Sequence, residues 1–595
     1  MIRLLLGSFI AASLCGPAVA AEQSPAIETA STIQANANPV VVDVVVTDAR
    51  HIPVHNLTSA DFKLYENGHA QTIKTFEEHH SWEAAAPIPS PPKLLRGTFT
   101  NYTNAPVSGA LNILLLDSLN TPMTGQADVR DQMLRYLKEA RPGTRMAIFG
   151  LNASLILLQG FTSDPELLSD VLNGKKGSPR ASPLLADAVN GDNPGADDPT
   201  MDEAEDAAAG LGNTPAAAQL VVRLQQFKAE TQSFPLQFRE RLTLDALNQL
   251  ARTLSGLPGR KNLIWFSGSF PIDILPDGAL ENPFGVVASA EDEFRETTEL
   301  LSRGQVAVYP IDAEGTFVTP TLSANHSGAM QAMAEATGGE ALVNANGLKE
   351  AVEKAIDTGS NYYALTYTPA NQKWSGDYRK VRVEIARPGL TLAYRRGYFA
   401  DDPTVPRRSA EKANAGPGQA APYSAMSTAM VRGGPDPTEI IFAAYVRPAI
   451  ADPEPDVAPG NSVTGKSAGP YRRYRVFFGV DAHDIECDAA PDGARHCALD
   501  AAILLYDADG TVFNSVSGRI ESSIPADRYA SMLIAGFHFV KDISVPVSGE
   551  FFLRVGVHDE TTDKIGTVEI PIAAVSKLPP LAAPAQSKDP PPDQH

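Results

Sequence analysis

Long hydrophobic runs are missing from this sequence of 595 residues: none reaches the roughly 20 apolar residues that a membrane-spanning helix needs. The apolar stretch Leu4–Leu14 follows the basic residue Arg3 and precedes a small-residue exit at Ala18-Val19-Ala20. This layout is typical of a cleaved secretory signal peptide. We therefore expect residues 1–20 to be removed and the remaining chain to be exported, to the periplasm or outside the cell, with no transmembrane segment.

Cysteine is also scarce. Apart from Cys15 in the predicted signal peptide, the chain contains only Cys487 and Cys497. Two cysteines ten positions apart in an exported chain predict one disulfide, and the alternative is a pair of buried free thiols. A zinc site would need two more ligands, and only His483 and His496 are near in the sequence.

Positive charge is low as well. The sequence has 49 Lys and Arg against 70 Asp and Glu, which gives a net charge of −21. Proteins that bind nucleic acid carry basic patches, so this balance argues against nucleic acid as a partner. With 43% hydrophobic residues, the chain can still build sizeable cores.

Known catalytic motifs are missing too. The chain contains no His-Glu-x-x-His pair, no Walker loop and no Gly-x-Gly-x-x-Gly turn. The segment Phe266–Phe270 lacks the Gly-x-Ser-x-Gly elbow of serine hydrolases, and His326 is the only histidine between residues 81 and 482. We therefore expect a protein that is not an enzyme, and a hydrolase of unknown type is the rival hypothesis.

What is present is a change of pattern along the chain. Val40–Val46 is a strand of β-branched residues, and Asn67-Gly68 is a hairpin-turn dipeptide. From residue 110 strands alternate with helices, beginning with the apolar run Leu111–Leu116, and this alternation predicts a doubly wound parallel sheet. Residues 437–575 contain short strands such as Arg475–Val480, which indicate a β-sandwich.

The predicted fold class is therefore α/β plus β. A doubly wound (Rossmann-like) sheet is inserted between two small β segments and is followed by a C-terminal β-sandwich-like domain. We expect the two β segments to pair into one small sandwich, because domain insertion joins chain ends that lie close together. The predicted parts after the signal peptide are a flexible lead-in at 21–38, an N-terminal β segment at 39–80, a linker at 81–109, an α/β domain at 110–360 with a largely disordered insertion at 173–235, a second β segment at 361–400, a linker at 401–436, a C-terminal β domain at 437–575 and a disordered tail at 576–595.

A candidate site follows the first buried strand, in the segment Asp117–Thr121. Ligands of open α/β sheets bind at the carboxyl ends of the strands. An acid and a hydroxyl that project there from one loop can hold a hard divalent cation, directly or through water. The structural alternative is that Asp117 caps a following helix or accepts hydrogen bonds from the loop backbone.

The strand, the Asp117 loop and the order of helices and strands resemble the von Willebrand factor A-type (VWA-type) domain, whose metal-ion-dependent adhesion site reads Asp-x-Ser-x-Ser. The resemblance extends over about residues 39–400 and is to the VWA-related proteins abundant in acidobacteria. The further segments that carry it are Leu57–Phe62, Tyr65–Gly68, Gly160–Asp164, Gly259–Leu263 and Arg395–Phe399.

Measured against this resemblance, the metal site is degenerate. Asp117 matches the first acid and Thr121 the final hydroxyl, but Leu119 replaces the middle serine and offers no side-chain oxygen. The strand that usually ends in a further metal-binding Asp runs into Ser267-Gly268-Ser269, and the remaining Thr ligand aligns only loosely, near Ser182. Asp117 and Thr121 are thus the candidate ligands for Mg²⁺ or Mn²⁺, and we expect no cofactor.

The leading hypothesis is an exported VWA-like module that binds a protein partner without a metal. The alternatives are a metal-dependent adhesion protein that uses Mg²⁺ or Mn²⁺, the hydrolase, and a structural envelope protein. One other metal candidate is the pair His79-His80 beside Glu77-Glu78. Adjacent residues of a strand point to opposite faces, so a solvated linker is the favoured interpretation there.

Overall fold

The computed structural model describes residues 39–80, 94–103, 110–121, 123–141, 143–152, 154–173, 239–268, 283–312, 320–342, 347–400, 425–464, 469–508 and 510–581. They divide into two compact units. The α/β unit holds the described residues of 39–80 and 110–400, and the β unit holds those of 94–103 and 425–581. The predicted signal peptide, the lead-in at 21–38 and the predicted insertion beyond residue 173 lie outside the described residues.

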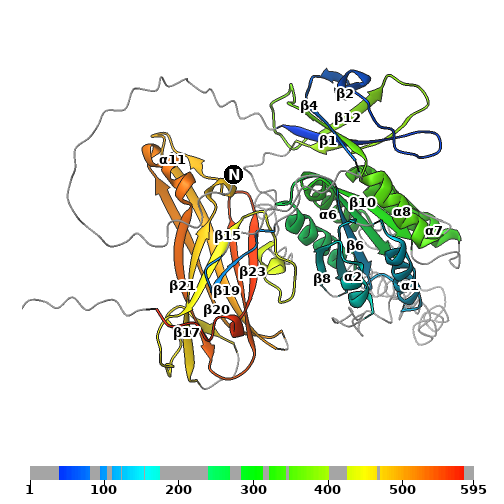
Figure 1. The fold of residues 1–595 in the computed structure, drawn as a ribbon. Coiled ribbons are helices and arrows are strands. Elements are labelled where there is room, and N and C mark those ends of the chain that lie inside the picture. Colours follow the sequence, from blue (N-terminus) through cyan, green and yellow to red (C-terminus); the bar gives the residue numbers. More distant parts are fainter. Residues whose placement is uncertain are drawn as a thin grey trace, which may run out of the picture. The chain divides into compact units, whose positions relative to one another are not determined.

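Five strands form the main sheet of the α/β unit, in the order β10-β9-β6-β7-β8 (Figure 1). If these five strands are renumbered 1 to 5 in chain order, so that β6 is 1 and β10 is 5, the order across the sheet from β8 is 3-2-1-4-5. This is the strand order of Rossmann-type sheets. The order reverses between β6 and β9, so the switch point of the sheet lies between these two strands. The strands are β6 (Leu111–Asp117), β7 (Met146–Leu151), β8 (Leu155–Thr162), β9 (Lys261–Ser267) and β10 (Val306–Asp312).

The prediction of a parallel sheet is correct for four of these strands and wrong for β8. Strands β10, β9, β6 and β7 pair in parallel, whereas β8 runs antiparallel to β7. The physical reason is the connection: only residues 152–154 join β7 to β8. A parallel crossover needs a dozen or more residues. A loop as short as this one can only form an antiparallel hairpin.

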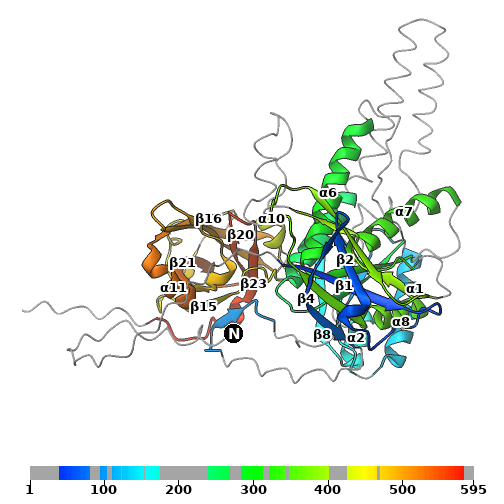
Figure 2. The ribbon, with the colours of Figure 1, turned by 90° about the horizontal axis from the view of Figure 1, so that it is seen from above.

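Helices cover both faces of this sheet (Figure 2). The alternation of side chains along β6 shows why, because Ile113 and Leu115 belong to one apolar core and Leu114 to the other. The first core includes side chains of the helix at 239–254, of α6 and of α7, and the second includes those of α1, α2 and α8. The bounds are α1 (Met123–Glu139), α2 (Pro165–Leu172), α6 (Pro283–Arg303), α7 (Pro320–Thr337) and α8 (Leu348–Gly359).

A small β-sandwich completes the α/β unit, and its strands come from both sides of the main sheet. One layer has the order β13-β1-β11-β4 and the other β14-β12-β2-β3. Val42 on β1 faces Leu365 on β11 in register, and Val42, Leu365, Leu64 and Val383 share one buried core. The bounds are β1 (Val40–Thr47), β2 (Phe62–Glu66), β3 (His69–Gln71), β4 (Ile73–His79), β11 (Tyr362–Tyr367), β12 (Tyr378–Ile385), β13 (Thr391–Ala393) and β14 (Gly397–Phe399), and the 3-10 turn η1 (Ser59–Asp61) precedes β2.

Buried charges join the small sandwich to the main sheet. Asp43 on β1 lies 3.8 Å from Arg260, which immediately precedes β9, and their side chains are 8% and 2% exposed. The Nη2 of Arg260 also donates to the Tyr309 hydroxyl at 3.1 Å and to the Gly338 carbonyl at 2.8 Å. The neighbouring Lys261 is 1% exposed, and its Nζ donates to the carbonyls of Leu257 and of Gly304, the latter at 2.9 Å.

Lys261 makes the stability of the α/β unit depend on pH. Burial lowers the pKa of its ammonium group to about 8, against 10.5 for the exposed group. Between these two values the unfolded chain binds a proton that the folded chain does not, so stability rises with pH. From pH 8 to pH 9.5 we expect a gain of about 1.5 kcal/mol, which Lys261→Met removes. Urea unfolding of the wild-type protein and of Lys261→Met at both pH values measures this gain. An equal change in stability with pH for the two proteins would contradict the prediction.

The β unit is built from two sheets around a shared apolar core. One sheet has the order β21-β17-β15-β5, and the other the order β16-β20-β19-β22-β23, with β18 paired to β19. Cys487 and Cys497 form a disulfide and are both buried in the core, which confirms the predicted bridge. The bounds are β5 (Thr98–Thr100), β15 (Phe442–Pro448), β16 (Ser462–Val463), β17 (Tyr471–Val480), β18 (Asp488–Ala489), β19 (Arg495–Asp507), β20 (Val512–Ile524), β21 (Phe537–Pro546), β22 (Phe551–Asp559) and β23 (Ile565–Pro571), with the helices α10 (Ala425–Ala429) and α11 (Ala526–Ala535) and the 3-10 turns η3 (Ala482–Asp484) and η4 (Ile572–Ala574).

Both linkers and the tail were predicted too long. Within the predicted linker 81–109, β5 pairs with β15, and Asn101 donates to the carbonyls of Pro437 and Ile440. Within 401–436, α10 forms and Asp436 pairs with the buried Arg554 at 2.5 Å. Residues 576–581 are also described, and the Leu581 amide donates to Pro448. A three-residue strand and a five-residue helix are too short for periodicity to reveal.

Candidate functional site

The site predicted at Asp117 lies at the carboxyl end of β6, beside the switch point of the main sheet. Asp117 is 2% exposed, as is Thr121. The loop between them is tied to β7, because the amides of Ser118 and Leu119 donate to the Leu151 carbonyl at 2.8 and 3.1 Å. On the helix side, the Gln126 side-chain amide donates to the carbonyls of Ser118 and Thr121. The backbone of the loop is therefore held by hydrogen bonds on both sides.

The Asp117 carboxylate accepts four hydrogen bonds from protein groups. Its Oδ1 accepts the Asn120 amide N–H at 2.9 Å. Its Oδ2 accepts the Asn120 side-chain amide at 2.8 Å, the Trp265 indole N–H at 3.0 Å and the Ser267 hydroxyl at 2.9 Å. Burial raises the pKa of the Asp117 carboxyl, and the bonds from Asn120, Ser267 and Trp265 oppose that rise. The carboxylate thus joins its own loop to β9.

Thr121 is held in a different way. Its hydroxyl oxygen accepts the Gly268 amide N–H at 2.9 Å, just beyond the end of β9. Asp117 and Thr121, the two predicted ligands, therefore lie on one loop, and both are bonded to the end of the same neighbouring strand. Neither side chain points into open solvent.

Two of the three residues between them, Leu119 and Asn120, have buried side chains. Leu119 is 1% exposed and joins the apolar core beneath the loop. Asn120 is fully buried, and its side-chain amide also donates to the Thr243 hydroxyl at 2.9 Å on the helix at 239–254.

A buried arginine contributes positive charge near this loop. Arg239 begins the described part of the helix at 239–254 and is 6% exposed. Burial lowers the pKa of its guanidinium, and the charge of Asp117 acts in the opposite direction. Neither Arg239 nor Thr243 has a spacing to Asp117 that the sequence could reveal, whereas Asn120 was visible inside the motif itself.

These residues do not fit an oxygen-lined Mg²⁺ or Mn²⁺ site. Mg²⁺ requires near-octahedral oxygen ligands and usually one or two carboxylates. Here Oδ2 already accepts three donors, Leu119 supplies no oxygen, and the Ser267 hydroxyl donates to Asp117. A second carboxylate, that of Asp312, lies on the neighbouring strand β10 opposite Ser267, but no contact between it and Asp117 is among those described above.

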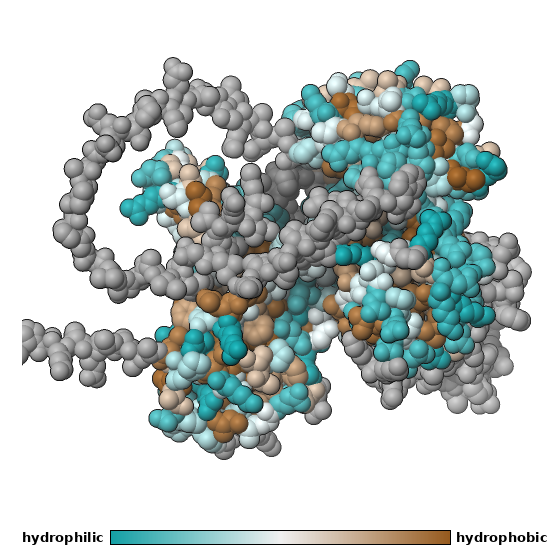
Figure 3. All heavy atoms as spheres, in the orientation of Figure 1, coloured by the Kyte–Doolittle hydropathy of each residue, from teal (hydrophilic) through white to brown (hydrophobic). Residues whose placement is uncertain are grey.

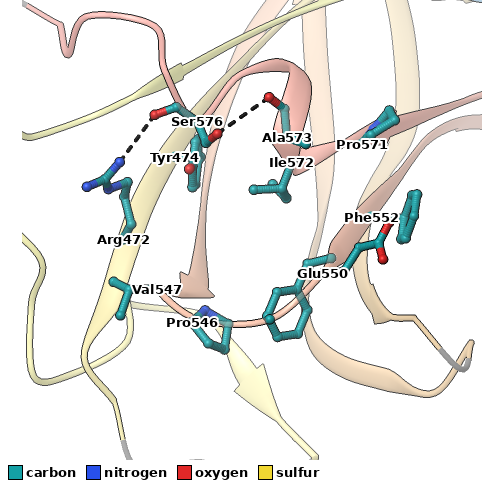
Figure 4. Close-up of a pocket in the computed structure, with 12 residues that line it drawn as sticks. Arg472, Tyr474, Pro546, Val547, Glu550, Phe552, Pro571, Ile572, Ala573 and Ser576 are labelled. Atoms are coloured by element: carbon teal, nitrogen blue, oxygen red, sulfur yellow. Dashed lines mark hydrogen bonds between the residues drawn. The ribbon is translucent and has the colours of Figure 1, made fainter.

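A pocket of about 430 Å³ lies in the β unit (Figure 4). Arg472 and Tyr474 of β17 form one wall, and Glu550 and Ile572 lie across from them. Arg472 donates to the Ser576 carbonyl at 3.2 Å. The lining combines apolar side chains with one arginine, one glutamate and the hydroxyl-bearing Tyr474 and Ser576.

Comparisons with known proteins yield similar structures only. No family model matches the chain, and no curated protein matches it. Solved structures that resemble it include the conserved hypothetical protein BatB from Bacteroides thetaiotaomicron, at 12% identity and a TM-score of 0.21, covering 42% of this chain and 97% of that one. A von Willebrand factor type A protein from Catenulispora acidiphila has 9% identity and a TM-score of 0.21, with 88% of this chain and 78% of that one covered.

A third similar structure comprises three N-terminal domains of the type V pili tip protein Mfa5 from Porphyromonas gingivalis. It has 8% identity and a TM-score of 0.23, and the match covers 90% of this chain and 78% of that one. TM-scores and identities of this size support no inference about family, ligand or activity. The site has to be interpreted from its own geometry.

Proposed function

We propose that this chain is an exported protein-interaction module whose VWA-like α/β unit binds a protein partner without a metal ion. The observation that carries the proposal is the saturation of Asp117 by four protein donors. A carboxylate used in this way stabilises the loop and has little capacity left for a cation. In this proposal the Asp117 loop forms a rigid part of the binding surface, and the Asp117 carboxylate is not a reactive group.

The carboxyl edge of the main sheet is the surface that we assign to the partner. Ligands of open α/β sheets bind at the switch point, which here lies between β6 and β9. Large exposed apolar side chains among the described residues, such as Leu157, Tyr378 and Val540, belong to different elements. Hydrophobic and hydrophilic residues are intermixed on the visible surface (Figure 3). We therefore place the site by the topology of the sheet and not by an exposed hydrophobic patch.

Export is part of the same proposal. The Cys487–Cys497 disulfide is the kind of bond that forms in oxidising compartments. None of the helices in the described ranges is long and apolar enough to span a membrane. We propose the periplasm or the cell exterior as the location, and we propose that the chain is not an enzyme.

Site-specific photocrosslinking tests where the partner binds. A photoreactive amino acid at Ser154, beside the carboxyl end of β7, should capture a partner protein from the source cells in the presence of EDTA. The matched control is the same substitution at Thr144, at the opposite end of β7. Capture from position 154 alone supports the proposal. Equal capture from both positions, or capture only when Mg²⁺ is added, contradicts it.

A further inference from the structure

A second cluster of metal-binding side chains lies in the small sandwich, away from the Asp117 loop. His55 follows β1, Glu78 belongs to β4 and His80 comes directly after β4. Among the described residues, these three are the only group of His, Cys, Asp or Glu side chains whose potential ligand atoms all lie within 4.8 Å of one another. We propose that His55, Glu78 and His80 form a binding site for a divalent transition-metal cation of the Zn²⁺ type.

The spacing of Glu78 and His80 explains why two of the three side chains of the cluster lie together. Residues two apart on a strand point to the same face, so these two side chains emerge together. His79 points the other way and stacks on Tyr362, with 4.5 Å between ring centroids and an interplanar angle of 16°. The expectation that adjacent histidines point to opposite faces is therefore correct, but the favoured solvated linker was wrong, because the strand β4 extends to His79 and the side chains of His79 and His80 are only 17% and 20% exposed. The sequence argument also did not consider a ligand from another segment.

His55 lies on the loop between β1 and η1. The loop folds back on β1, because the Val54 amide donates to the Val46 carbonyl at 2.9 Å. The next residue after His55, Asn56, has a left-handed backbone with φ of 58°. The backbone N–H of Asn56 donates to both carboxylate oxygens of Glu78, at 2.9 and 3.2 Å. These bonds fix the loop against β4 and hold His55 beside Glu78.

The distances between the potential ligand atoms match those around a tetrahedral ion. The Nδ1 atoms of His55 and His80 lie 3.1 Å apart, and the Glu78 Oε1 lies 3.3 Å from the first and 3.7 Å from the second. Zinc bonds of roughly 2.0–2.1 Å at tetrahedral angles place neighbouring ligand atoms about 3.3 Å apart. The three donor atoms are thus already at the spacing that one ion requires.

The surroundings of Glu78 fit the supporting shell of a metal site. The Tyr363 hydroxyl lies 2.9 Å from both Glu78 Oε1 and the Val54 carbonyl oxygen, and its single proton can go to the carbonyl when Oε1 binds an ion, which leaves room at Oε1 that Asp117 Oδ2 lacks. The side chains of His55, Glu78 and His80 are 23%, 17% and 20% exposed, so the cluster is half-buried yet accessible to an ion from solution. Three protein ligands leave a fourth position for water or for a side chain of a partner.

The ligand types define the class of ion. Two imidazole nitrogens and one carboxylate suit Zn²⁺, Ni²⁺ or Cu²⁺, whereas Mg²⁺ and Ca²⁺ prefer oxygen ligands alone. The same three residues without a metal would form a hydrogen-bonded clasp, with one imidazole donating to the other. The two interpretations differ in whether the intact protein binds the ion and whether both histidines are needed.

Calorimetric titration with ZnCl₂ distinguishes them. The full chain without its signal peptide, freed of any polyhistidine tag, should bind one Zn²⁺ through this cluster. His55→Ala and His80→Ala should each weaken binding by at least about 100-fold, because even changes outside the ligand shell cost 10–100-fold. His69→Ala is the matched control, since His69 is an exposed histidine of the same sandwich, and it should leave the affinity unchanged.

A thermal melt of each variant without metal shows whether it is folded. If a histidine variant fails to fold, Glu78→Gln and His80→Gln, which retain hydrogen-bonding groups, take its place in the titration. No Zn²⁺ binding by the intact protein, or undiminished binding by folded variants at both histidines, would overturn the proposal and leave the hydrogen-bonded clasp. Because the partner experiment above is done in EDTA, its result does not depend on this site.

Discussion

Asp117→Ala is expected to lower the free energy of unfolding of the α/β unit by about 3–5 kcal/mol, the usual cost of removing one partner from a buried charged network. The substitution removes the acceptor of the Trp265 indole N–H and of the Asn120 backbone N–H, in surroundings that water does not reach. It also leaves the buried Arg239 without the nearby negative charge that favours its charged form. A carboxylate reserved for a metal would behave differently, because its removal would change the stability of the metal-free protein little or increase it.

Urea unfolding followed by tryptophan fluorescence measures this effect cleanly. Trp265 and Trp374 belong to the α/β unit, and the described part of the β unit contains no tryptophan, so a change in the signal of these two residues reports on the α/β unit. Asp164→Ala serves as the control, because Asp164 caps α2 by accepting the Glu166 amide and should cost only about 1 kcal/mol. Equal losses for the two variants would contradict the structural role of Asp117.

Asp43→Ala is expected to destabilise the same unit by about 3–5 kcal/mol, for a related reason. The guanidinium of Arg260 would remain buried with no carboxylate near it, and the contact between β1 and the main sheet would be lost. Burial raises the pKa of Asp43, and Arg260 and Arg395 counteract that rise. The double variant Asp43→Ala/Arg260→Met should recover part of the loss, because it removes the uncompensated charge.

An exposed ion pair provides the comparison. Arg141 and Asp357 lie 2.8 Å apart in the same unit, but their side chains are 68% and 40% exposed. Asp357→Ala should therefore cost less than about 1 kcal/mol. If Asp43→Ala costs no more than Asp357→Ala in the same urea series, the buried pair does not join the small sandwich to the sheet.

Features with a local signal could be predicted from the sequence. The apolar run Leu111–Leu116 lies in β6, the β-branched segment Val40–Val46 lies in β1, and the two cysteines ten residues apart form their disulfide. In each case the residues that determine the structure are close in sequence. The direction of β8 had a local signal as well, the three-residue connection 152–154, which the strand–helix pattern obscured.

Contacts between distant segments could not be predicted. The Trp265 indole reaches Asp117 across 148 positions, and no spacing rule connects them. The same holds for Asn101, whose partners lie more than 330 positions away in the β unit. His55 and Glu78 are 23 positions apart, and their encounter depends on how the loop after β1 folds back. The segment Asp117–Thr121 was recognisable in the sequence as the loop after β6, but tertiary contacts determine what its residues can bind.

The most direct test of the metal-independent account is a calorimetric titration of the exported chain with Mg²⁺ and Mn²⁺. Carried out in the His80→Ala background, it excludes the histidine cluster as the source of any signal. We expect no binding at sub-millimolar ion concentrations, because the four donors to Asp117 already occupy the carboxylate. Binding that disappears in Asp117→Ala would contradict the account, would make Asp117 and Thr121 metal ligands, and would favour the metal-dependent adhesion protein.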